Sequence, residues 1–130
     1  MSVLYQPGQE LASTDLRIFL KDRNGTGVNV YQVLYSLYYW DPALKEYTTV
    51  SGQYQQTAQN GPAIGQYWAA WDIPFGQPVG QYEVRWDFKT SDSATYQQSR
   101  SRFAIAKIPV GTYRTAQVSD LAGTPFVIVT

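Results

Sequence analysis

Residues 82–89 alternate without interruption between apolar and charged side chains, and no other feature constrains the fold of this chain as tightly. The apolar set is Tyr82, Val84, Trp86 and Phe88, and the charged set is Glu83, Arg85, Asp87 and Lys89. Successive side chains of a strand point to opposite sides, so this pattern predicts a β-strand with one buried and one solvated face. Prolines and glycines alternate just before it and predict a sharp corner at residues 74–80, because sheet and helix interiors do not tolerate them.

The composition of the chain argues against several classes of chemistry. Its 130 residues suffice to bury the core of one domain, and without cysteine no disulfide contributes to stability. Histidine, the commonest general base and a usual zinc ligand, is also absent. We therefore expect no metal, no cofactor and no catalytic residue. Ten acidic and ten basic residues give zero net charge without a basic cluster, so nucleic-acid binding is not expected either.

Membrane insertion and secretion are not expected from the sequence. No apolar run approaches the length needed to cross a bilayer. The first residues show no cationic leader followed by an apolar run, so no secretion signal is predicted. We expect a protein made in the cytoplasm that has no membrane partner.

Short apolar segments separated by turn residues run through most of the chain and predict an all-β fold. They lie at residues 3–5, 16–21, 28–40, 47–54, 65–72, 81–89 and 95–108, whereas residues 55–65 are polar and are expected to form a loop. No segment has helical periodicity. Turn signals spaced about every eight to twelve residues are typical of a sandwich or a barrel. The strand count and the corner favour a β-sandwich of about seven antiparallel strands.

The strand faces also predict which side chains fill the core. We expect the following residues between the sheets: Leu16, Ile18, Leu20, Val33, Tyr35, Leu37, Val84, Trp86 and Phe103. Tyr82 comes directly after the corner, so its hydroxyl is expected to bond a backbone group there and hold the connection in place. Tyr82 and Trp86 are thus the predicted structural residues of this region.

Residues 109–130 lie beyond the predicted strands and are expected to form a C-terminal extension to a domain of residues 1–108. Within the extension only residues 126–129, which are apolar and uncharged, have the pattern of a strand. Such a segment aggregates readily when left unpaired, so it is expected to pair with a sheet edge. Either it folds back as one more strand of its own sandwich, or it adds to a neighbouring subunit.

Two polar patterns have a structural explanation that outweighs a chemical one. Residues 22–27 offer oxygen donors at alternate positions, as a calcium loop does, but they lack the later bidentate glutamate and fit a hairpin turn. Glu83 and Asp87 share a strand face with basic residues. This arrangement is typical of a solvated surface with cross-strand ion pairs rather than of the carboxylate pair of a glycosidase.

Aromatic residues make up 15% of the chain and 11 of them are tyrosine, a composition typical both of sheets and of protein interfaces. The candidate protein-interface residues are Tyr38, Trp40, Tyr47, Tyr54, Trp68, Phe126 and Ile128. Four aromatic residues could instead form a platform for sugar rings or fill the core: Tyr38, Trp40, Trp68 and Trp71.

Several segments, read in order, resemble one type of domain. They are residues 5–8, 16–22, 24–25 and 33–37, followed by Gly65-Gln-Tyr-Trp-Ala-Ala-Trp-Asp-Ile-Pro74 and Pro78-Val-Gly-Gln-Tyr-Glu-Val-Arg-Trp86. This order resembles the immunoglobulin-like domains found in extracellular bacterial proteins and in tailed-bacteriophage virions. The resemblance covers about residues 3–106 and implies an immunoglobulin-like β-sandwich.

Within that group, a short sandwich rich in tyrosine and glutamine, without cysteine or histidine and with a tail, looks most like a virion structural protein. The resemblance implies a non-enzymatic protein that binds other virion subunits as capsid cement or decoration protein, or as a neck or tail accessory. It also implies a homo-oligomer or another multi-copy assembly. The alternative is a carbohydrate-binding or adhesion module that uses exposed tryptophan and tyrosine. A third class is a hydrolase, which would require a buried carboxylate with a shifted pKa.

Overall fold

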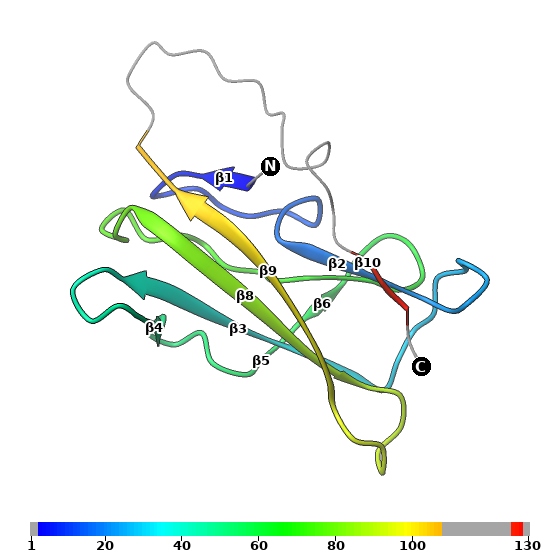
Figure 1. Cartoon of the computed structure of the whole chain (residues 1–130). Helices are drawn as coiled ribbons and strands as arrows, with labels where there is room; N and C mark the ends of the chain where they lie inside the picture. The colour runs from blue at the N-terminus through cyan, green and yellow to red at the C-terminus, as the bar shows by residue number, and fades with distance from the viewer. Residues whose placement is uncertain (1–2, 108–125, 129–130) are drawn as a thin grey trace.

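The computed structural model describes residues 3–107 and 126–128, which form two β-sheets lying face to face (Figure 1). The six-stranded sheet has the order β1 (Val3–Tyr5), β9 (Gln97–Ile105), β8 (Gly80–Lys89), β3 (Gln32–Asp41) and β4 (Glu46–Thr49), and β5 (Gln56–Thr57) also pairs with β3. The four-stranded sheet has the order β10 (Phe126–Ile128), β2 (Arg17–Lys21), β7 (Gln66–Trp68) and β6 (Gln59–Asn60). The described residues contain no helix, and hence none that could span a membrane. The predicted all-β, sandwich-like character is confirmed.

Two of the strand pairs are parallel, which corrects the expectation of a purely antiparallel fold. β1 runs parallel to β9, and β10 runs parallel to β2. A tight hairpin imposes an antiparallel direction, but β1 and β10 lie towards the two ends of the chain and are not joined to their partners by a hairpin. The described residues also form ten strands rather than about seven, because several are only two or three residues long and leave no periodic pattern.

Long ladders between β3, β8 and β9 form the centre of the six-stranded sheet. β3 pairs with β8 from Gln32 opposite Lys89 to Tyr39 opposite Tyr82. The ladder between β8 and β9 starts at Gly80 and continues to Phe88. The apolar side chains of β8 point into the core as predicted.

Side chains from both sheets meet in one hydrophobic core. All nine residues predicted for it are buried: Leu16, Ile18, Leu20, Val33, Tyr35, Leu37, Val84, Trp86 and Phe103. Trp86 is 1% exposed and lies with its ring centroid 6.2 Å from that of Tyr35. The rings of Tyr82 and Phe103 stack at 5.3 Å, so aromatic contacts connect the three central strands inside the core.

The corner before β8 is held by the hydroxyl of Tyr82. This hydroxyl donates a hydrogen bond to the carbonyl oxygen of Pro78 at 2.5 Å and accepts one from Nε2 of Gln77 at 2.9 Å. The expected bond between Tyr82 and the backbone of the corner is therefore present. The ring of Tyr82 is fully buried, so the corner is tied directly to the core.

The polar segment at residues 55–65 is not a plain loop, and this expectation was wrong. It contains β5, which pairs with β3, and β6, which pairs with β7, so the chain crosses here from one sheet to the other. Between them Ala58 is buried and its N–H donates to the carbonyl oxygen of Val33 at 3.0 Å. Main-chain pairing alone makes these strands, and their polar side chains gave no periodic signal.

The turn after β2 is a hairpin turn, as predicted. The Oδ1 atom of Asp22 accepts hydrogen bonds from the backbone N–H groups of Asn24 at 2.8 Å and Thr26 at 3.0 Å. An isolated bridge between Lys21 and Gly27 closes the turn. The carboxylate of Asp22 thus stabilises local backbone, which is the ordinary role of aspartate in such turns.

Of the C-terminal extension, only β10 belongs to the described residues. Its backbone pairs with β2, with Phe126 opposite Phe19 and Ile128 opposite Lys21. Residues 108–125 and 129–130 lie outside the described residues, so the predicted boundary at residue 108 is not tested.

Candidate functional site

The six-stranded sheet has an outer face that points away from the core and carries most of the exposed aromatic and charged side chains of its strands. Residues directly opposite each other on adjacent strands point to the same side, so the register gives the members of this face. One row across the sheet consists of Arg102, Glu83, Tyr38 and Thr49, and the next of Arg100, Arg85 and Ser36. A third row consists of Gln98, Asp87, Leu34 and Thr57. We call this surface the outer face.

The outer face contains a hollow of about 270 Å³. Its lining combines three tyrosines with charged and amide side chains: Leu34, Ser36, Tyr38, Tyr54, Gln55, Arg85, Asp87, Tyr96 and Gln98. Tyr54 is 54% exposed and Tyr96 is 42% exposed, so their rings remain available for contact. Side chains from four separate segments of the chain meet here.

The segment after β4 brings Tyr54 to the hollow. The backbone N–H of Gln55 donates to Oγ of Ser36 at 2.9 Å, and the N–H of Leu37 donates to the carbonyl oxygen of Gln53 at 2.8 Å. These two bonds fasten residues 53–55 over β3. Ser36 is 2% exposed as a result, although it lies on the outer face.

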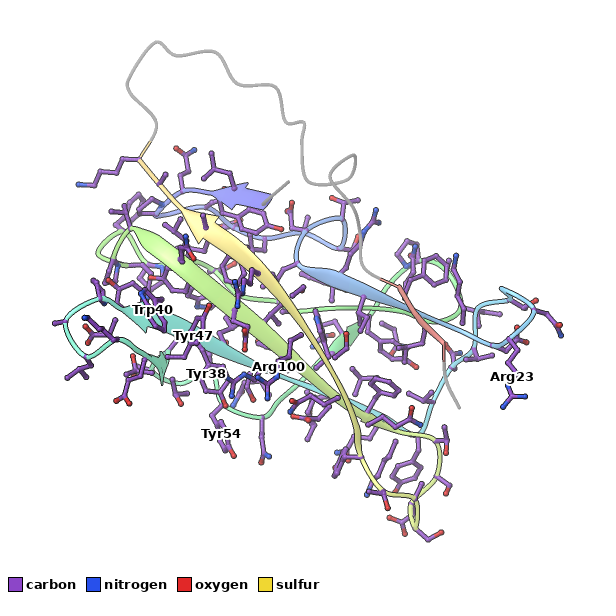
Figure 2. All side chains as sticks on the ribbon, viewed as in Figure 1. Arg23, Tyr38, Trp40, Tyr47, Tyr54 and Arg100 are labelled. Carbon is purple, nitrogen blue, oxygen red and sulfur yellow. The ribbon has the colours of Figure 1, made fainter. Side chains whose placement is uncertain are left out.

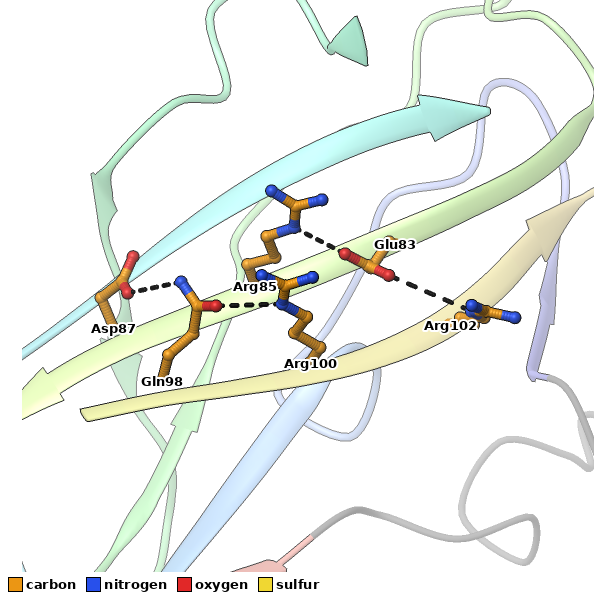
Figure 3. Close-up of polar contacts among 6 residues, drawn as sticks. All are labelled: Glu83, Arg85, Asp87, Gln98, Arg100 and Arg102. Carbon is orange, nitrogen blue, oxygen red and sulfur yellow. Dashed lines mark hydrogen bonds and ion pairs between the residues drawn. The ribbon is translucent and has the colours of Figure 1, made fainter. Parts of the chain in front are cut away.

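An ion pair with the buried Glu83 holds Arg85 in the lining of the hollow. Glu83 is only 5% exposed, and its Oε1 lies 2.6 Å from Nε of Arg85 (Figure 3). The guanidinium of Arg85 lies over the ring of Tyr38, 4.0 Å from the ring centroid. Nε of Arg102 lies 4.0 Å from the other oxygen of Glu83. The carboxylate of Glu83 is thus covered by two guanidinium groups.

The environment of Arg85 keeps it charged. Burial is the largest single influence and would lower the pKa of Arg85. The hydrogen bond and charge of Glu83, with a further contribution from Tyr38, outweigh burial and raise the pKa above its ordinary value. Arg85 is therefore a permanent cation whose position is fixed by Glu83 on one side and by the ring of Tyr38 on another.

A second polar chain crosses from β8 to β9. Oδ1 of Asp87 accepts a hydrogen bond from Nε2 of Gln98 at 3.1 Å, and Oε1 of Gln98 accepts one from Nε of Arg100 at 2.9 Å (Figure 3). The amide of Gln98 therefore connects the carboxylate of Asp87 with the guanidinium of Arg100.

The structure divides the candidate interface residues between two surfaces. Four of them lie on the side of the six-stranded sheet: Tyr38, Trp40, Tyr47 and Tyr54 (Figure 2). The rings of Trp40 and Tyr47 meet edge to face, 5.2 Å apart. Trp68 lies on β7 in the other sheet, and Phe126 and Ile128 lie on β10 beside β2. The set does not form one continuous site.

The remaining aromatic candidates are structural. Tyr82 and Trp86 are fully buried, as their structural assignment requires. Trp71 is 5% exposed and belongs to the core, so it cannot take part in a sugar platform. The expectation that Glu83 lies on a solvated strand surface was also wrong, because Arg85, two residues away on the same strand face, covers it.

Several residues of the hollow escaped sequence reasoning: Arg85, Asp87, Tyr96 and Gln98. For Arg85 and Asp87 the only signal was the alternation of β8, which indicates an outward direction and nothing about neighbours. Tyr96 and Gln98 come close to Arg85 and Asp87 through the register between β8 and β9. No residue pattern in β9 predicts that register.

The described residues contain no group of three or more carboxylate, histidine or cysteine side chains that could hold a metal ion. Comparison with known proteins found no matching family, no matching curated sequence and no matching solved structure. Any functional conclusion must therefore be argued from the chemistry of the surface, and the outer face offers exposed tyrosines beside a fixed arginine.

Proposed function

We propose that the two sheets form an immunoglobulin-like sandwich of the variable type. The order β9-β8-β3-β4 in one sheet and β2-β7-β6 in the other corresponds to the arrangement in which an additional strand extends the larger sheet. The bond from Tyr82 to the corner before β8 supports this assignment, since such domains place a tyrosine corner at that point. The buried tryptophans are a departure, because Trp86 lies on β8 and Trp71 lies between β7 and β8, and neither lies on β3.

We further propose that the protein is a non-enzymatic structural module that binds other protein subunits through the outer face. The observation that carries this proposal is the hollow, where exposed tyrosines surround a fixed arginine. Tyrosine, tryptophan and arginine are the residues most enriched at the energetic centres of protein interfaces. Their rigid placement also lowers the entropy lost on binding.

The same geometry speaks against hydrolysis. A glycosidase needs one carboxyl group held neutral in an apolar setting, opposite a second carboxylate. Glu83 is buried, but its Oε1 lies 2.6 Å from Nε of Arg85, so its setting is an ion pair rather than an apolar one. Asp87 accepts a hydrogen bond from Gln98 and is the only carboxylate in the lining of the hollow, so no second carboxylate stands opposite it there. Neither group is placed as a general acid.

The assembly in which we place this module is a tailed-bacteriophage particle, as a capsid cement or decoration protein or as a neck or tail accessory. This part of the proposal rests on the sequence resemblance of residues 3–106. A place in such a particle implies that the protein is present in many copies and is made in the cytoplasm of the host.

The proposal is tested by sedimentation velocity and by particle composition. We expect the wild-type chain to self-associate with rising concentration, or to band with particles purified from the producing cell. Tyr54→Ala and Trp40→Ala should weaken this association, whereas Trp68→Ala, a change on the opposite sheet, should not. A chain that stays monomeric and is absent from every particle would contradict the proposal.

The alternative function, a carbohydrate-binding module, is supported by one observation. The hollow combines tyrosine rings with the amide of Gln98 and the carboxylate of Asp87, and sugar rings stack on aromatics while their hydroxyls bond such groups. Binding of the isolated chain to a glycan array, lost in Tyr54→Ala, would favour this alternative over the protein-binding module.

A further inference from the structure

We infer that the hollow binds a carboxylate side chain from an acidic segment of a partner protein, with Arg85 as the anchoring cation. This inference rests on the proposed protein-binding function and adds the chemistry of the partner. Binding of the carboxylate depends on the hydrogen-bonding groups of the outer face that point towards solvent.

The first step concerns the orientation of Arg85. Glu83 engages its Nε, and the two terminal nitrogens of the guanidinium point away from Glu83 (Figure 3). The ring of Tyr38 supports one side of the guanidinium plane. A guanidinium fixed in this way can present two parallel N–H donors, the geometry that matches a carboxylate.

Guanidinium groups outnumber carboxylates on the outer face of β8 and β9. Across β8 and β9 the face carries three guanidinium groups, those of Arg85, Arg100 and Arg102, against the two carboxylates of Glu83 and Asp87. Glu83 is buried between Arg85 and Arg102, whereas the Arg102 side chain is 70% exposed. Arg100 is also exposed, with its Nε bonded to Gln98. The exposed charge beside the hollow, on β9, is therefore positive, while the hollow itself is lined by Arg85 and by Asp87, whose carboxylate is bonded to Gln98.

The volume of the hollow limits what it can hold. Pockets that enclose a whole drug-sized ligand measure about 300–1,000 Å³, and the hollow, at about 270 Å³, lies just below that range. It fits one inserted side chain of a larger partner. The exposed rings of Tyr54 and Tyr96 offer contact area for the rest of the segment.

A nucleic acid is the less suitable anionic partner. Affinity for nucleic acids grows with the number of phosphates neutralised, and a face with three arginines and two retained carboxylates can neutralise few. The chain as a whole has zero net charge. Binding of a single well-placed carboxylate requires fewer cationic side chains on the surface.

The test measures fluorescence anisotropy of labelled probes with the full chain. The probes are a short peptide of alternating glutamate and glycine, the same peptide with glutamine, and oligothymidylate. We expect the glutamate peptide to bind and the glutamine peptide to bind at least about tenfold more weakly, since a charge-assisted hydrogen bond is stronger than the neutral one that glutamine offers. Salt should weaken the binding.

Variants locate the site. Arg85→Gln should weaken binding of the glutamate peptide at least about tenfold, and Arg85→Lys less, because lysine keeps the charge without the fork. The matched control is Arg23→Gln, which removes the same charge from the exposed turn far from the hollow and should leave affinity unchanged (Figure 2). Arg100→Gln, at an exposed position, provides a second site variant should Arg85→Gln fail to fold.

The inference is overturned if the glutamate peptide fails to bind at about 1 mM, or if Arg85→Gln and Arg100→Gln bind it as the wild type does. Tighter binding of oligothymidylate would replace the acidic protein by a nucleic acid. A chain that joins particles or self-associates but ignores the glutamate peptide would leave the proposed function intact and remove only this inference.

Discussion

The two sheets of this protein are held together in different ways. In the six-stranded sheet, β3 and β8 pair over eight residues and β8 and β9 over nine. In the four-stranded sheet, β2 pairs with β7 and with β10 over three residues each, and β6 pairs with β7 over two. One sheet is a continuous ladder, and the other is a set of short contacts.

The four-stranded sheet compensates through its loops and its buried side chains. The N–H of Leu20 donates to the carbonyl oxygen of Gly65 at 2.8 Å, and the N–H of Ala69 donates to that of Leu16 at 3.0 Å. Ile18, Leu20 and Ala69 are fully buried against the other sheet. The comparison teaches that long main-chain ladders hold the centre of the larger sheet, whereas the smaller sheet relies on loop hydrogen bonds and on packing against the larger one.

The largest effect is expected from the centre of the larger sheet. Trp86→Ala should lower the free energy of unfolding by about 3–5 kcal/mol, because it leaves a large cavity between the sheets. Urea denaturation measures the loss. Trp68→Ala, a half-buried tryptophan on the smaller sheet, is the matched control and should cost less. Equal losses in the two variants would show that removing a tryptophan destabilises the smaller sheet as much as the larger one.

Removing β10 tests the edge of the smaller sheet. Deletion of residues 124–130 should lower the free energy of unfolding by about 1–3 kcal/mol, since three paired residues are lost and each hydrogen bond contributes about 0.5–1.5 kcal/mol net. Because β10 pairs with β2 of its own chain, the loss should be the same at low and high protein concentration. Unchanged monomer stability with lost self-association would instead assign the strand to a neighbouring subunit.

A smaller effect is expected where the larger sheet meets the corner. Tyr82→Phe removes the hydrogen bonds to Pro78 and Gln77 and leaves the carbonyl of Pro78 without this donor. The free energy of unfolding should fall by about 1 kcal/mol or somewhat more. Urea denaturation decides this as well, and an unchanged midpoint would mean that the corner does not need the hydroxyl.

The smallest effect should appear at alkaline pH. Burial raises the pKa of Tyr35 and Tyr82 above 10.0, with a hydrogen bond from Gln77 opposing the shift at Tyr82 and the charge of Tyr39 adding to it. The folded chain therefore keeps these protons while the unfolded chain releases them. The stability they contribute is present below pH 10 and falls as the pH rises above it.

At about half a pH unit above 10, the contribution of each of these two tyrosines to the free energy of unfolding should have fallen by less than about 1 kcal/mol. The measurement is urea denaturation across this range, with Tyr82→Phe as the control that loses less than the wild type. A Tyr82→Phe variant with the same alkaline decline as the wild type would assign the decline to other groups.

The sequence predicted the central part of the fold well. The alternation in residues 82–89 identified β8 and its buried face, and all nine predicted core residues are buried. These predictions succeeded because a long strand with one wet face must repeat every two residues. The same rule fails for β5 and β6, whose polar side chains are exposed and whose strand character lies in main-chain bonds to β3 and β7.

The candidate site was predicted less completely. Tyr38 and Tyr54 were named as interface residues, yet Arg85, Tyr96 and Gln98 were missed. Arg85 and Gln98 follow the ordinary alternation of their strands, and Tyr96 lies just before β9. They became a site through the register of β8 with β3 and β9, which is set by many residues at once.

The sequence by itself determined an all-β chain, the faces of its long strands and the corner at Tyr82, because these follow from local periodicity and from proline and glycine. Only the tertiary structure decided that β1 and β10 run parallel to their partners, and that Glu83 is buried beneath two arginines. It also decided that Tyr54 reaches the hollow beside Arg85. Such pairings join residues far apart in the chain, and they depend on the packing of the whole core rather than on any local pattern.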